Sequence, residues 1–166
     1  MNNYNFSIKC RQEFNVSSSI IWSIISKESN LDLYHPFCKK NDVISWKDDN
    51  HHDRLEYLNG VVLERKFTSW NKEKGYELNI GRKNGRHSHV SWTIENISEN
   101  KSALSIEVYP WMINQGNKVF QFFPFRLFVK PQLKSYLNSV LSGLKWHVEN
   151  NEITPKNHFG KLSWFS

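Results

Sequence analysis

Histidine is the side chain best suited to acid–base chemistry in this sequence, because its pKa lies near neutral pH. His35 lies in the stretch DLYHPF, and His147 lies one residue from the apolar stripe of a helical segment near the C-terminus. No serine, histidine and aspartate follow the order of a catalytic triad, and no phosphate-binding loop is found. A histidine without such partners is more often structural, so His35 is only a weak catalytic candidate.

Two other groups of residues have the side-chain types of metal ligands. His87 and His89 share the polar face of the segment HSHVSWTIEN, but two ligands without a third make an incomplete site. His51, His52 and Asp53 lie in the polar stretch DDNHHD, which is typical of a hairpin turn. We therefore predict neither a metal nor another cofactor.

One arginine is predicted to point toward the interior. In VVLERKFTSW the alternating set Leu63, Arg65 and Phe67 is the more apolar one. A guanidinium in an apolar cavity requires a carboxylate or an anionic ligand group; otherwise Arg65 reaches the rim and stays in water. Tyr57 and Tyr76 share the inward face of the neighbouring strands, where a phenol could orient a ligand carbonyl or complete the core.

The apolar pattern predicts the elements that position these side chains. Residues 4–16 alternate as a strand, and two short helical segments follow, the second ending near His35 because Pro36 disfavours helix before it. The sequence then predicts six antiparallel strands between residues 42 and 113, with type I′ turns at Asn59-Gly60 and Asn84-Gly85. A long amphipathic helix over 133–150 completes the order, with Gly143 as a weak point.

Composition limits the remaining possibilities. A chain of 166 residues with 14% aromatic residues can form one domain with a core rich in rings. Cys10 and Cys38 are too far apart for a metal motif, and no signal peptide or membrane span is apparent, so we predict a cytoplasmic protein. The net charge of +6 comes from scattered Lys and Arg, which does not favour nucleic acid as a partner.

The order of elements resembles the helix-grip fold of the START and polyketide-cyclase superfamily, SRPBCC. The resemblance spans roughly residues 4–150 and is carried by four stretches: FNVSSSIIWSIISKESNLDLYHPF, VVLERKFTSW with GYELNI, HVSWTIEN, and PQLKSYLNSVLSGLKWHVEN. It implies an α+β domain over residues 1–151, in which a curved seven-stranded antiparallel sheet wraps around the C-terminal helix. It also implies a cavity for an apolar small molecule. The tail, residues 152–166, has no assigned role.

The stretch FQFFPFRLFVKPQ, residues 120–132, places five phenylalanines around Pro124 and Pro131, which are expected to interrupt regular helix. We expect either a lid at the cavity mouth, with Phe122 and Phe123 partly exposed, or an extension of the core. The predicted ligand-binding residues are Tyr57, Arg65, Phe67, Tyr76, Leu78, Val90, Trp92, Phe122, Phe123, Leu137 and Leu141.

These expectations favour binding of a hydrophobic or amphipathic small molecule, with transport as one option; the ligand classes left open are a lipid, a quinone precursor and a polyketide-like compound. A polyketide cyclase or dehydratase that uses His35 with Tyr57 or Arg65 is the first alternative, so whether the chain is an enzyme stays open. The second is an interaction module that docks a partner protein or, transiently, a membrane through the Phe-rich segment. The sequence leaves the oligomeric state open.

Overall fold

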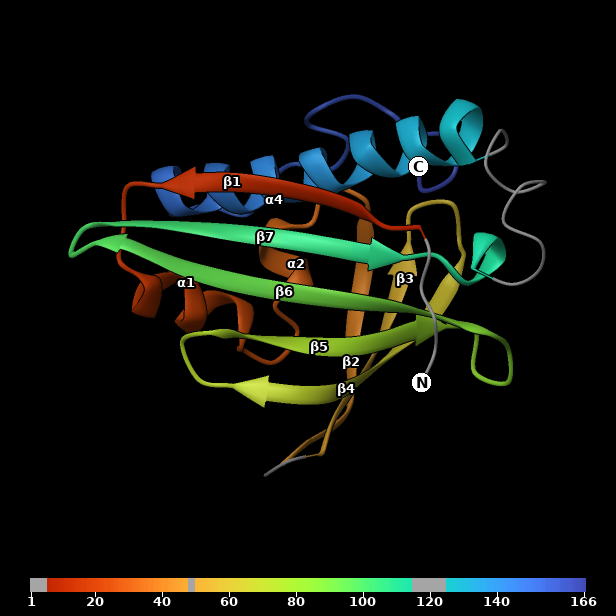
Figure 1. Ribbon diagram of the computed structural model, residues 1–166, viewed down its shortest axis with the longest axis horizontal. Helices are drawn as coiled ribbons and strands as arrows, with labels where there is room; N and C mark the ends of the chain where they lie inside the picture. Colours follow the sequence, from red (N-terminus) through yellow and green to blue (C-terminus); the bar gives the residue numbers. More distant parts are fainter. Residues whose placement is uncertain (1–5, 48–49, 115–124) are drawn as a thin grey trace.

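The computed structural model describes residues 6–47, 50–114 and 125–166 (Figure 1). One strand and two short helices come first, six strands follow, and a long helix ends the domain. The elements are β1 (Ile8–Phe14), α1 (Ser18–Ile25), α2 (Leu31–Tyr34), β2 (Cys38–Lys47), β3 (Asn50–Tyr57), β4 (Val62–Asn71), β5 (Gly75–Gly81), β6 (His87–Ser98), β7 (Lys101–Tyr109), η1 (Trp111–Ile113), η2 (Phe125–Val129) and α4 (Lys130–Asn150). This order confirms the predicted α+β helix-grip architecture.

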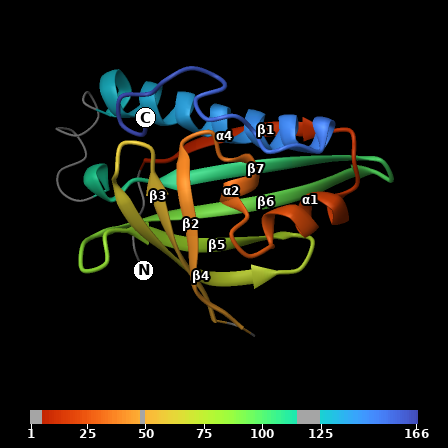
Figure 2. The ribbon, with the colours of Figure 1, turned by 180° about the vertical axis from the view of Figure 1, so that it is seen from behind.

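The seven strands form one antiparallel sheet in the order β1-β7-β6-β5-β4-β3-β2. Neighbours from β2 to β7 are consecutive hairpins, and β1 pairs with β7 from Ile8 opposite Val108 to Phe14 opposite Ser102. In Figures 1 and 2, β2 and β3 run at a steep angle to β6 and β7, so the sheet curves. The long helix α4 lies against the concave side and closes the space that this curvature creates.

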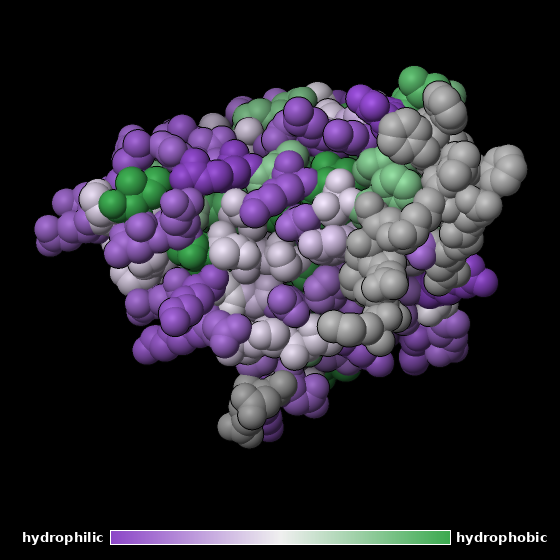
Figure 3. Space-filling model, in the orientation of Figure 1, coloured by the Kyte–Doolittle hydropathy of each residue, from purple (hydrophilic) through white to green (hydrophobic). Residues whose placement is uncertain are grey.

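Alternation along the strands separates an apolar inner face from a polar outer face. On β6, Val90, Trp92 and Ile94 are buried, while His87 and His89 point outward as predicted. His89 lies on the outer face, with its Nδ1 atom 3.4 Å from the side-chain oxygen of Asn79. The view in Figure 3 shows mostly hydrophilic to neutral side chains over this part of the sheet.

The stretch DDNHHD is predicted to be a turn. This prediction is wrong for residues 50–53, because β3 begins at Asn50. Trp46 pairs with His51 and Val43 pairs with Asp53, so these residues continue the β2–β3 ladder. Alternation then buries His51 and Asp53 on the inner face. Polar side chains suggested a turn, but cross-strand pairing and the inward ion pair described below outweigh that local preference.

Both predicted Asn-Gly hairpins are present, but neither turn is of type I′. Four residues, 58–61, connect β3 to β4, and Gly60 adopts a positive φ of 83° while Asn59 does not. Five residues, 82–86, connect β5 to β6, and neither Asn84 nor Gly85 has a positive φ. Because both loops are longer than two residues, the backbone reverses without two consecutive left-handed positions.

The helix α4 differs from its prediction at two residues. It begins at Lys130, directly after η2, and contains Pro131 in its first turn, so Pro131 does not interrupt the helix. Gly143 is not a weak point, since a Cβ atom there would lie 2.2 Å from the backbone oxygen of Tyr34. Glycine therefore permits α4 to pack closely against the end of α2. No helix in the described part of the chain is long and apolar enough to cross a membrane.

The tail, residues 152–166, folds back over α2 and α4. The backbone N–H of Thr154 donates to the oxygen of Leu33 (2.9 Å), and its hydroxyl donates to the oxygen of Gly143 (2.8 Å). Near the end of the tail, the side-chain amide of Asn59 donates to the backbone oxygen of Trp164 (2.8 Å). These hydrogen bonds place the aromatic end of the tail beside the β3–β4 turn.

Candidate functional site

The predicted cavity is present between the inner face of the sheet and α4, with a volume of about 680 Å³. This volume lies within the range of about 300 to 1,000 Å³ that is typical of small-molecule pockets. Its walls are predominantly apolar and come from α2, from all strands between β3 and β7, from η1 and η2, and from α4. The aliphatic lining consists of Leu31, Leu55, Leu63, Leu78, Ile80, Val90, Ile106, Val108, Val129, Leu133, Leu137 and Val140.

The residues predicted to bind a ligand fall into three groups. Those that line the cavity are Tyr57, Arg65, Leu78, Val90, Trp92 and Leu137, together with His35. Phe67, Tyr76 and Leu141 do not line it and pack in or against the hydrophobic core. Phe122 and Phe123 lie outside the described residues. His147 does not line the cavity, and its Nδ1 atom lies 2.6 Å from the backbone oxygen of Glu152.

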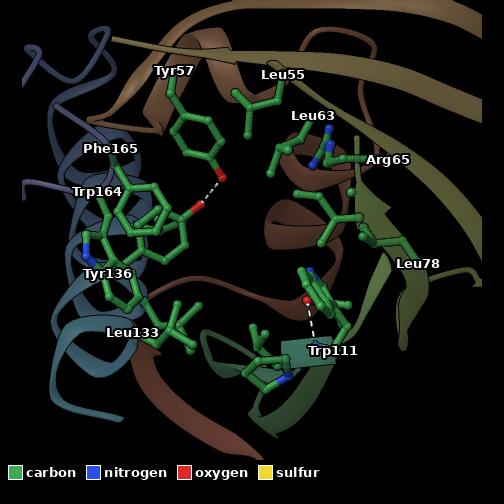
Figure 4. Close-up of a pocket in the computed structure, with 18 of the residues that line it drawn as sticks. Leu55, Tyr57, Leu63, Arg65, Leu78, Trp111, Leu133, Tyr136, Trp164 and Phe165 are labelled. Carbon is green, nitrogen blue, oxygen red and sulfur yellow. Dashed lines mark hydrogen bonds between the residues drawn. The ribbon is translucent and has the colours of Figure 1, made fainter. Parts of the chain in front are cut away.

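Three of the polar side chains that line the cavity form a hydrogen-bonded chain. The Nε2 atom of His35 lies 2.8 Å from the hydroxyl oxygen of Tyr136, which lies 2.9 Å from the hydroxyl oxygen of Tyr57. Figure 4 shows the two phenols, from α4 and β3, pointing toward each other at one side of the cavity. The fold therefore joins the residue that follows α2 with residues of α4 and β3 into one polar group on an apolar wall.

The direction of donation from His35 follows from its other ring nitrogen. The backbone N–H of Phe37 donates to His35 Nδ1 (3.2 Å), so a neutral ring carries its proton on Nε2 and donates to Tyr136. In the contact between the two phenols, either hydroxyl can donate. When Tyr136 donates, the hydroxyl proton of Tyr57 is left for an acceptor in the cavity, such as a carbonyl or hydroxyl oxygen.

Burial keeps all three groups neutral. It lowers the pKa of His35 to about 3, with further lowering by the charges of Arg65 and Lys156. Burial also raises the pKa of Tyr57 to about 12 and raises the pKa of Tyr136 well above its ordinary value. At neutral pH this end of the cavity therefore offers hydrogen bonds without a net charge.

The lowered pKa of His35 predicts a loss of stability in acid. Its ordinary value is 6.5, so below that pH the unfolded chain gains a proton that the folded protein does not accept until about pH 3. Stability from this group is complete above about pH 6.5 and falls as the pH decreases. We expect denaturant unfolding to show a decrease of about 2 kcal/mol from about pH 7 to about pH 5 that His35→Gln lacks. Equal pH dependence in both proteins would contradict the assignment.

Of the two placements left open for Arg65, the cavity interior and the wet rim, the structure shows the interior, and the partner of Arg65 is a carboxylate of the protein. Arg65 is 3% exposed and Asp53 is fully buried. Arg65 Nε donates to one carboxylate oxygen at 2.7 Å, and an Nη atom donates to the other. Burial lowers the pKa of Arg65, but the charge and hydrogen bonds of Asp53 outweigh it and raise the pKa above its ordinary value. Asp53 therefore neutralises this arginine at the cavity wall.

Sequence reasoning missed Asp53, Tyr136 and the end of the tail as parts of the site. Asp53 has the same parity as the inward residues Leu55 and Tyr57, so an earlier start for β3 would have identified it. Tyr136 lies three residues after Leu133 and thus shares the apolar face of α4. The contribution of the tail has no comparable signal, because it depends on contacts across the fold.

Two aromatic residues of the tail border the cavity. Trp164 and Phe165 line it, and the ring of Phe165 lies 4.1 Å from that of Tyr136 and 5.1 Å from that of Tyr57 between centroids. Figure 4 shows Phe165 beside both phenols. The tail thus covers the hydrogen-bonded chain from one side.

The Phe-rich segment is only partly described. Phe120, Phe122 and Phe123 lie outside the described residues, so the lid remains a prediction. Phe125 is 6% exposed and its ring lies 5.0 Å from that of Phe6, whereas Phe128 is 68% exposed. The described part of this segment therefore supplies one phenylalanine to the core and one to the surface.

Comparison of the sequence with protein-family models and with curated proteins gives no match. The fold, in contrast, matches solved structures. A START superfamily protein from Mycobacterium smegmatis has a TM-score of 0.67 at 14% identity, over 87% of this chain and 98% of that one. DynU16, from the dynemicin biosynthetic locus, has a TM-score of 0.67 at 11% identity, over 91% of this chain and 50% of that one.

The di-domain ARO/CYC protein StfQ, from the steffimycin biosynthetic pathway, has a TM-score of 0.61 at 8% identity. The match covers 87% of this chain and 45% of StfQ. At such low identities the likeness concerns the arrangement of the backbone. The chain therefore has the helix-grip fold of the START-like SRPBCC proteins.

Proposed function

We propose that this protein binds, and carries, a hydrophobic or amphipathic small molecule in the cavity between the sheet and α4. The observation that carries this proposal is the cavity itself, about 680 Å³ with predominantly apolar walls. Burying apolar ligand surface there contributes about 25 cal/mol per Å². The hydroxyl of Tyr57 adds one polar group that can donate or accept a hydrogen bond, which suits a ligand with a carbonyl or hydroxyl oxygen. The START-like neighbours support a ligand-binding fold.

Binding of the neutral fluorophore phenylnaphthylamine tests this proposal. We expect saturable binding, with fluorescence excited outside the tryptophan absorption band, and retention of apolar compounds in native mass spectrometry. The double variant Val90→Trp/Leu133→Trp fills the cavity from β6 and α4 and should weaken binding at least about tenfold, a difference of about 1.4 kcal/mol. As a matched control, Val62→Trp/Leu127→Trp adds the same rings at exposed positions outside the lining.

Thermal unfolding of both double variants shows whether each is folded. Weak binding by a folded cavity variant and unchanged binding by the control would support the proposal. Equal binding by both, or no binding by the unmodified protein, would refute it.

A second candidate function is a cyclase or dehydratase, which the His35–Tyr136–Tyr57 chain favours. In the tautomer described above, His35 donates its proton to Tyr136, so His35 is not placed to remove a proton. When Tyr136 donates to Tyr57, the Tyr57 hydroxyl is free to polarise a carbonyl in the cavity. Polarisation of this kind would stabilise negative charge that develops on a carbonyl oxygen. The polyketide-cyclase-like neighbours are equally compatible with this function. Turnover of an aromatic polyketide by the protein, lost in Tyr57→Phe with binding retained, would support it over binding alone.

A further inference from the structure

We propose that the mouth of the cavity is an anion subsite in which Arg82 and Arg86 bind the acidic group of an amphipathic ligand. This inference rests on the proposed binding function and names the class of ligand: an apolar body with a carboxylate or phosphate. It concerns the mouth of the cavity, whereas the hydrogen-bonded tyrosines lie deeper on one wall.

The β5–β6 loop brings both arginines to the cavity. Gly81, Arg82, Gly85 and Arg86 line it, although both arginine side chains are solvent-exposed. The guanidinium of Arg86 lies 5.4 Å from the ring centroid of Trp111, which is also a lining residue. Exposed arginines that border an apolar cavity can hold an anionic group at the water boundary while the rest of the ligand is buried.

Neighbouring structure fixes the position of this loop relative to the cavity. The backbone N–H of Trp111 donates to the hydroxyl of Ser88 at 3.2 Å, which connects η1 to the start of β6. Figures 1 and 2 show the β5–β6 loop, η1 and the beginning of α4 at the same end of the molecule. In Figure 4, Trp111 lies across the cavity from Tyr57. A ligand could therefore contact a hydroxyl donor inside and a cation at the mouth.

The β5–β6 loop at the mouth carries positive charge without an acid of its own. Residues 82–86 contain three Lys or Arg and no Asp or Glu. Within the described ranges, no Asp or Glu lines the cavity. Clefts lined by charge of one sign attract the opposite charge and concentrate it locally. The mouth is therefore complementary to an anion.

The buried arginine of the cavity wall does not serve this purpose. Asp53 binds the guanidinium of Arg65 through both carboxylate oxygens, so the pair has no net charge. An anionic ligand that approached Arg65 would also meet the charge of Asp53. Arg82 and Arg86 are thus the arginines placed to attract an anion.

Two fluorophores that differ in one anionic group test the subsite. Anilinonaphthalene sulfonate is anionic, whereas phenylnaphthylamine has the same aromatic body without the sulfonate. We expect Arg82→Gln/Arg86→Gln to weaken binding of the sulfonate about three- to tenfold and to leave phenylnaphthylamine unchanged. The preference of the unmodified protein for anilinonaphthalene sulfonate over phenylnaphthylamine should also decrease with added salt, because exposed charges are screened.

The matched control is Lys72→Gln/Lys74→Gln, which removes two positive charges from the exposed β4–β5 turn. That turn lies at the other end of β5, about 20 Å away for a strand of this length. The Lys72→Gln/Lys74→Gln variant should leave binding of both fluorophores unchanged. An equal loss of sulfonate binding in this control would show a general charge effect and overturn the proposal.

Competition against phenylnaphthylamine identifies the acidic group. Dodecanoate and dodecyl phosphate should each displace it at lower concentration than dodecanol, and the ratio between the two anions shows which head group is preferred. An equal response to all three would refute the subsite but leave cavity binding intact. Failure of phenylnaphthylamine to bind would refute both proposals. If the arginine variant lost only association with phosphatidylglycerol vesicles, the basic surface would serve a membrane and the ligand subsite would be wrong.

Discussion

Asp53→Asn is expected to lower the free energy of unfolding by about 3 to 5 kcal/mol. Asp53 is fully buried, and its carboxylate is the charged partner of Arg65. Asparagine has nearly the same shape but no charge, so it would leave a buried guanidinium without a counter-charge. The side-chain oxygens of Asn30 and Asn41, each 3.5 Å from an Arg65 nitrogen, are too distant to replace two strong hydrogen bonds. Denaturant unfolding followed by circular dichroism measures the change.

The double variant Asp53→Asn/Arg65→Met separates loss of the ion pair from loss of shape. Removing the cation as well should restore much of the lost stability, because an apolar side chain of similar length has no desolvation penalty. The surface pair of Glu13 with Lys101 provides a control, since both side chains are largely in water and Glu13→Gln should leave the unfolding midpoint nearly unchanged. Wild-type stability of Asp53→Asn, or a double variant no more stable than it, would contradict this account.

Phe165→Ala is expected to lower the free energy of unfolding by about 1 to 2 kcal/mol and to open one side of the cavity. The ring is partly buried against Tyr57 and Tyr136. Its loss would expose the two phenols to water and remove part of the cavity wall. We therefore expect phenylnaphthylamine to enter and leave several times faster in stopped-flow measurements, with a smaller change in its affinity.

Phe159→Ala is the matched control, because Phe159 belongs to the same tail but is exposed and does not line the cavity. It should change stability by no more than about 0.5 kcal/mol and leave both rates unaltered. Equal rates in the Phe165 variant and the unmodified protein would show that the tail does not limit access to the cavity.

Local patterns were sufficient for the main elements of the fold. Apolar alternation identified the strands and helical spacing identified α4. Pro36 predicted an end of the second short helix near His35, and α2 ends at Tyr34. The same alternation placed Tyr57 and Arg65 on the inner face, where both line the cavity. These features were predictable because each depends only on residues that are close together in the sequence, within one or two helical turns or a few positions of a strand.

The errors arose where distant contacts outweighed local preference. The stretch DDNHHD has the composition of a turn, but pairing with β2 and the charge of Arg65 place Asp53 inside the sheet. Pro131 and Gly143 are unfavourable in an average helix, yet one lies in the first turn of α4 and the other contacts α2. Whether such a residue is unfavourable depends on its position and neighbours, which the sequence does not display.

The sequence by itself determined the order of the elements, the apolar inner face and the large aromatic content of the core. Periodicity encodes these features directly, because one face of each element must leave water. Only the tertiary structure joined His35, Tyr136 and Tyr57 into one hydrogen-bonded chain and placed Phe165 against it. It also brought Arg82 and Arg86 of the β5–β6 loop to the lining of the cavity. Such groupings depend on contacts between residues up to about a hundred positions apart, which packing of the whole sheet around α4 decides.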